Sequence, residues 1–114
     1  MVRVVEGSGA MWTAVRVVAG GIRRPGRADG RLCCPRGLRF TADGTGLAVA
    51  DWMNNRVSLF RVEDGSFVRQ VATEVSYPID VEECEGGWLV VCFGPDTTGI
   101  EFVSGDVDGG GPWW

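Results

Sequence analysis

The chain has 114 residues and a formal net charge of −4, with 45% hydrophobic and 23% charged residues, so it is long enough for one small globular domain and too apolar for a disordered chain. Its weakly acidic balance gives no electrostatic footprint for a phosphate backbone, which disfavours nucleic acid as a partner. The sequence contains no His, and all eleven basic residues are Arg, which excludes a His-based triad, histidine metal ligation and lysine Schiff-base chemistry.

The first third of the chain predicts two strands and a long loop. Residues 2–5 and 12–19 carry runs of Val and other residues typical of strands, and residues 6–10 form a turn between them. Residues 20–35 are polar and include Arg23-Arg24-Pro25-Gly26-Arg27, which cannot form a sheet ladder. This stretch is therefore expected to be an exposed basic loop.

A regular series of strands and turns follows Pro35. Strands are predicted over residues 37–41, 47–52, 56–62 and 67–72, with turns at Asp43-Gly44, Asn54-Asn55 and Asp64-Gly65. Short connections join antiparallel neighbours, and the Asp-Gly pairs supply residues that tolerate a positive φ. The series predicts a four-stranded antiparallel meander.

A second, similar unit begins at Pro78. Residues 78–83, 88–93 and 100–103 follow the positions of the first three strands of the meander, and Pro35 and Pro78 are 43 residues apart. A period of about 40 to 45 residues is typical of four-stranded propeller blades. The amino-terminal strands then match the third and fourth strands of a blade. The whole chain is predicted to be all-β, a propeller fragment of about two four-stranded antiparallel blades.

The first complete unit resembles an NHL repeat. The matching residues are Pro35, Gly37, Leu38, Asp43, Gly44, Val49, Ala50, Asp51, Asn54, Asn55, Arg56, Val57, Asp64 and Gly65. The second unit departs from this pattern, because Val91-Cys92-Phe93-Gly94 lacks the Asp and residues 96–99 lack the Arg. The resemblance implies an interaction module, while some similar proteins bind RNA and a few are metal-dependent lyases or hydrolases.

This interpretation divides the chain into three parts. Residues 1–34 hold the closing strands and a linker loop, residues 35–77 the NHL-like blade, and residues 78–114 a degenerate second blade with a Gly-rich tail. Two blades leave apolar sheet faces exposed, so self-association is expected. A homotrimer, which would supply the six or so blades of similar propellers, is favoured over a tetramer. Trp113 and Trp114 are expected to dock on a neighbouring subunit.

No catalytic, cofactor-binding or metal-binding residue is assigned. Asp51 and Arg56 flank a turn and are expected to pair across it, and Asn54 and Asn55 suit left-handed geometry. The remaining candidates for calcium binding or acid–base chemistry are carboxylates, which include Asp43, Asp80, Glu82, Glu83, Glu85, Asp106 and Asp108, but none has EF-hand spacing. An exposed acidic strand is the preferred interpretation of residues 80–85.

The cysteines and the absence of a leader suggest the compartment. Cys33, Cys34, Cys84 and Cys92 lack C-x2-C spacing, and no secretory or membrane-spanning apolar run is visible, which favours reduced thiols in a cytoplasmic protein.

Three functions remain open. The favoured function is a protein-interaction scaffold that binds a protein or peptide on the loop faces of the ring. The alternatives are a lactonase-like hydrolase with a carboxylate-bound metal, and RNA binding through the loop with Arg23, Arg24, Arg27 and Arg31.

Overall fold

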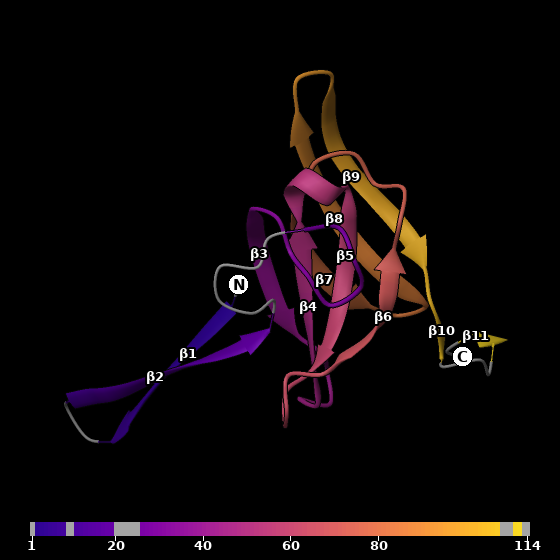
Figure 1. Cartoon of the computed structure of the whole chain (residues 1–114). Helices are drawn as coiled ribbons and strands as arrows, with labels where there is room; N and C mark the ends of the chain where they lie inside the picture. The colour runs from indigo at the N-terminus through magenta and orange to yellow at the C-terminus, as the bar shows by residue number, and fades with distance from the viewer. Residues whose placement is uncertain (1, 9–10, 20–25, 108–110, 113–114) are drawn as a thin grey trace.

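The computed structural model describes residues 2–8, 11–19, 26–107 and 111–112, and nearly all of its regular structure is antiparallel β-sheet (Figure 1). Four sheets are present among these residues: β3–β6, β7–β9 and the two pairs β1–β2 and β10–β11. The strands are β1 (Val2–Ser8), β2 (Met11–Ala19), β3 (Pro35–Phe40), β4 (Gly46–Asp51), β5 (Arg56–Arg61), β6 (Phe67–Ala72), β7 (Pro78–Cys84), β8 (Gly87–Gly94), β9 (Thr97–Ser104), β10 (Asp106–Val107) and β11 (Gly111–Pro112).

The first main sheet is the predicted meander. Its strand order is β3-β4-β5-β6, and every neighbouring pair is antiparallel. The β3–β4 and β5–β6 connections turn at Gly44 and Gly65, whose φ angles are +76° and +74°. Glycine adopts this backbone region without a steric penalty, so the Asp-Gly pairs fix where the strands reverse.

The connection between β4 and β5 is more elaborate than a two-residue turn. Trp52–Asn54 form a 3-10 helix, η1, and Asn55 then takes the left-handed conformation with φ of 53°. Trp52 was expected at the end of a strand, but β4 ends at Asp51 because the chain coils there. The prediction of left-handed geometry is confirmed for Asn55, whereas Asn54 belongs to the helix.

The second main sheet has the order β7-β8-β9 and repeats the first three strands of the meander. Gly86 in its first turn has a φ of +83°, as Gly44 does in the first sheet. On its outer side β9 has no strand neighbour in the described part of the chain. One edge of this sheet is therefore open.

The two main sheets pack face to face through an apolar core. One face of the first sheet contributes Ala48, Val57, Leu59 and Val71, and the second sheet contributes Val81, Trp88, Val90 and Cys92. Strands β3 and β7 approach so closely at Gly37 that a Cβ added there would lie 2.9 Å from Cα of Asp80. Glycine at position 37 thus sets the spacing of the sheets.

A second cluster lies on the opposite face of the first sheet. Leu47, Val49 and Phe60 of β4 and β5 pack there with Val2 and Leu32. Val2 lies at the start of β1, and Figure 1 shows the β1–β2 hairpin extending away from the first sheet beyond β3. The two strands predicted near the amino end form a separate antiparallel pair, but β1 continues to Ser8, so residues 6–8, which were predicted as part of a turn, belong to the strand.

Candidate interaction surface

A buried polar cluster joins β4, η1 and β5 at one end of the first sheet. Nε of Arg56 lies 3.2 Å from Oδ2 of Asp51, and both side chains are almost fully buried. Nδ2 of Asn54 donates to the same Oδ2 at 2.8 Å. The ion pair predicted across this turn is present, and its polar atoms are well supplied with partners, as buried charges require.

This cluster holds the loop that precedes β3. The two terminal nitrogens of Arg56 donate to the backbone carbonyls of Arg27, Ala28 and Arg31, at 2.6, 3.2 and 2.7 Å. Oδ1 of Asp51 accepts the backbone N–H of Cys33 at 2.7 Å. These residues therefore have a structural role, which fixes residues 26–34 against the sheet.

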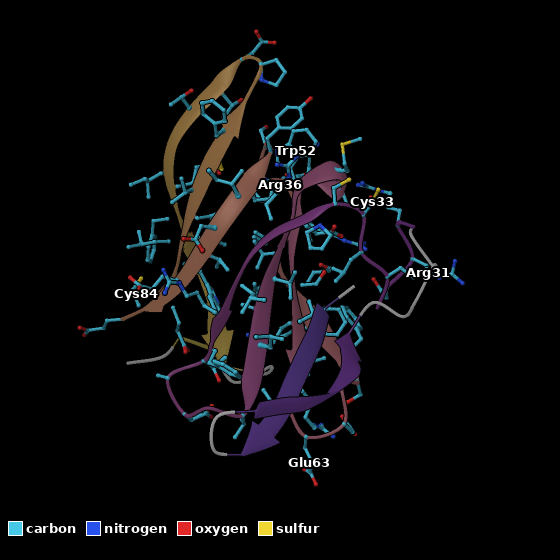
Figure 2. All side chains as sticks on the ribbon, turned by 90° about the vertical axis from the view of Figure 1, so that its left-hand side faces the viewer. Arg31, Cys33, Arg36, Trp52, Glu63 and Cys84 are labelled. Carbon is cyan, nitrogen blue, oxygen red and sulfur yellow. The ribbon has the colours of Figure 1, made fainter. Side chains whose placement is uncertain are left out.

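An aromatic group lies at the same end. The guanidinium carbon of Arg36 lies 4.6 Å from the centre of a Trp52 ring, in cation–π range, and Tyr77 packs tilted against the indole at 5.5 Å. Figure 2 shows Arg36 beside Trp52 at this end and Glu63 at the other. Nε1 of Trp52 donates to the carbonyl of Phe93 at 3.4 Å, so the group also links the two main sheets.

A groove of about 800 Å³ opens at the opposite end, between the two Asp-Gly turns and the second sheet. Leu59, Val62 and Val68 provide apolar walls, while Glu63 and Glu83 are among the charged residues that line it. Trp88 also lines the groove, and among the described buried side chains its Nε1 is a donor without an acceptor. The groove has the mixed apolar and charged lining that suits a peptide side chain.

Asp43, at the rim of this groove, is a structural carboxylate. Its Oδ1 accepts hydrogen bonds from the hydroxyl of Thr41 and from both the N–H and the hydroxyl of Thr45. These bonds lower the pKa of Asp43 to about 2. Asp64 is similar, because bonds from the hydroxyl and N–H of Ser66 lower its pKa. Both carboxylates brace the turns in which they lie.

The most exposed apolar surface lies on the outer face of the second sheet. Ile100 and Phe102 of β9 stand opposite Val91 and Leu89 of β8, and cross-strand partners share a face. Phe93, Ile100 and Phe102 are 60%, 69% and 56% exposed. This face, defined by Leu89, Val91, Phe93, Ile100 and Phe102, is called the β8–β9 face below. A contiguous apolar face of this kind marks a contact site.

The other predicted carboxylates do not form a metal cluster. Asp80 pairs with Arg39 at 3.6 Å, and Glu83 accepts the backbone N–H of Ala42 at 2.7 Å. Glu82 and Glu85 are exposed. Among the described residues, no group of three or more acidic or cysteine side chains is placed to hold a metal ion. The side chain of Asp106 and all of Asp108 lie outside the described residues.

The four cysteines are free thiols, in line with the interpretation from the sequence. Burial, with Glu101 nearby, raises the pKa of Cys92, and for Cys33 burial raises the pKa together with the adjacent Cys34 and with Asp51. Thiols with raised pKa values are poor nucleophiles near neutral pH. Cys92 also packs in the core between the two main sheets.

The basic loop is described only in part. Arg27 and Arg31 have exposed side chains, and Nη1 of Arg27 donates to the carbonyl of Asn54 at 3.0 Å. Arg23 and Arg24 lie outside the described residues, as do Trp113 and Trp114, the expected docking residues of the tail.

Neither the protein-family models nor the curated proteins include a match to this chain. In the described residues no helix is long and apolar enough to cross a membrane.

Proposed function

We propose that this chain is a protein-interaction or scaffolding module built on an oligomeric NHL-type β-propeller. The observation that carries the proposal is the β8–β9 face, which leaves three large apolar side chains more than half exposed beside the open edge of β9. Burial of such side chains contributes roughly 1.5–3 kcal/mol each, so association is strongly favoured. The repeated sheet order and the face-to-face packing support the blade interpretation.

Ring closure by further copies would cover the β8–β9 face and would also provide a strand partner for the open edge of β9. A fourth strand added to β9 would complete its backbone hydrogen bonds, and β2 is a nine-residue strand that pairs only with β1 among the described strands. Three copies of two blades give the six or so blades expected for the ring, with four copies as the next option.

Light scattering coupled to size exclusion tests the assembly. The expected mass is three times 12.3 kDa. A mass of four times this value would replace the trimer by a tetramer, and a folded monomer at all concentrations would contradict the proposal.

The ligand site of the module is the groove between the two Asp-Gly turns. Its apolar walls and charged rim suit an extended peptide with an apolar anchor side chain. Peptides selected from a display library on the wild-type protein should lose affinity at least tenfold for Val68→Arg, which blocks the groove. Met53→Arg, at an exposed position in η1, is the matched control and should bind these peptides as the wild type does.

A further inference from the structure

The strand registers relate the two main sheets: β3 and β5 match β7 and β9 at an offset of 43 positions, and β4 matches β8 at an offset of 41. Val57 and Leu59 therefore correspond to Ile100 and Phe102, and both pairs lie on the third strand of their sheet. Val57 and Leu59 are buried against the second sheet, whereas Ile100 and Phe102 are exposed. The β8–β9 face is thus the counterpart of a face that is covered inside the same chain.

The covering surface has a counterpart as well. Val81, Trp88 and Val90 of the second sheet cover the first sheet, and the strand registers relate them to Leu38, Leu47 and Val49. The surface defined by Leu38, Phe40, Leu47 and Val49 is called the β3–β4 face. Leu47 and Val49 are already buried there with Leu32 and Val2, while Leu38 and Phe40 remain 45% and 62% exposed and form the open part of this face.

We infer that the β8–β9 face of one copy packs on the β3–β4 face of a second copy, head to tail, in the way that the two sheets pack within one chain. This inference rests on the proposed self-assembly and specifies its interface. The inferred contact repeats the contact between the two sheets of one chain. The β8–β9 face corresponds to the face of the first sheet that is covered, and the β3–β4 face corresponds to the surface of the second sheet that covers it.

Mixing of two disabled variants tests the inference. Ile100→Asp disables the β8–β9 face and Leu38→Asp disables the β3–β4 face, and both positions are exposed enough to accept Asp without unfolding the chain. Each variant alone should be a monomer of 12.3 kDa. An equimolar mixture should form a heterodimer of twice that mass, because one intact interface remains between the two variants.

Other results would overturn the inference. If Leu38→Asp assembles like the wild type while Ile100→Asp does not, the β8–β9 face contacts something other than the β3–β4 face. A mixture of the two variants that stays monomeric would also overturn the inference. A monomeric wild type contradicts the proposed self-assembly itself, which separates the two failures.

Two further variants guard against misfolding. Phe102→Asp and Phe40→Asp should reproduce the behaviour of Ile100→Asp and Leu38→Asp, and Met53→Asp should leave the wild-type mass unchanged. Circular dichroism of each variant verifies that the β-structure is retained.

Discussion

The side chain of Asp51 joins two parts of the chain that lie on either side of β3: its Oδ2 contacts Nε of Arg56 at 3.2 Å, and its Oδ1 accepts the N–H of Cys33 at 2.7 Å. Through this one carboxylate the β4–β5 connection and the loop before β3 are held together. Its loss should therefore affect both the ion pair and the loop.

Asp51→Asn should destabilise the protein by about 3 kcal/mol, because it leaves the buried Arg56 guanidinium without a counter-charge. Urea unfolding measures this loss as a lower midpoint at an unchanged slope. Asp64→Asn is the control, since Asp64 pairs with Arg61 at 3.8 Å on an exposed turn, where solvent screens the pair, and its loss should lower the midpoint much less. Equal effects of the two substitutions would contradict the structural role of Asp51.

Substitutions of Asn55 should separate its backbone role from its side-chain role. Its φ of 53° is left-handed, and its Oδ1 accepts the N–H of Tyr77 at 2.9 Å. Asn55→Gly should cost about 1 kcal/mol for the lost bond, and Asn55→Ala about 2 kcal/mol or more, because alanine also resists this φ. Asn55→Asp keeps the acceptor and should stay close to the wild type. Thermal unfolding of the three variants should give this order, and an Ala variant as stable as the Gly variant would argue against it.

Gly37→Ala should destabilise the contact between the main sheets. The added Cβ would collide with the backbone of Ile79 and Asp80, and overpacking of this kind costs roughly 1–3 kcal/mol. At Gly99 the corresponding space is empty, so Gly99→Ala should leave the melting temperature unchanged or slightly raised. An equal drop in melting temperature for the two variants would show that the loss of glycine, rather than the close approach at position 37, is responsible.

The stability of the β3–β4 turn should depend on pH, because the turn is braced by the ionised carboxylate of Asp43. Its pKa is about 2 in the folded protein against 3.8 for the free side chain. The stabilisation is therefore complete above pH 3.8 and is lost as the pH falls towards 2. An NMR titration of the Asp43 carboxyl carbon should give a midpoint near 2. Thr41→Ala with Thr45→Val should move that midpoint upward, and an unchanged midpoint would refute the hydrogen-bond explanation.

The sequence was sufficient to place the strands of both main sheets and the Asp51–Arg56 pair. Asp-Gly pairs at regular spacing mark the reversals, and a short connection brings its flanking residues together. The 3-10 turn at Trp52 was not predicted, because Trp suits a strand equally well. The loop contacts of Arg56 could not be predicted either, since they go to backbone carbonyls 25–29 residues away. Every residue has such a carbonyl, and no side-chain pattern marks which ones are used.

The sequence predicted that two blades would leave apolar sheet faces exposed, but it did not predict which face. Apolar residues at alternate strand positions predict a buried face, and Ile100 and Phe102 follow that pattern. Only the arrangement of the two sheets distinguishes the covered face of the first from the open face of the second. The groove at the Asp-Gly turns was missed for the same reason, because its walls come from both sheets.

The contacts of Arg56 also have an evolutionary consequence. Its guanidinium binds the carbonyls of Ala28 and Arg31, so the loop is held without any use of the side chains at these two positions. We therefore expect positions 28 and 31 to tolerate changes of side chain better than positions 51 and 56, whose side chains make the contacts. A loop that diverges in sequence while its backbone path is maintained is well suited to acquire new binding specificities.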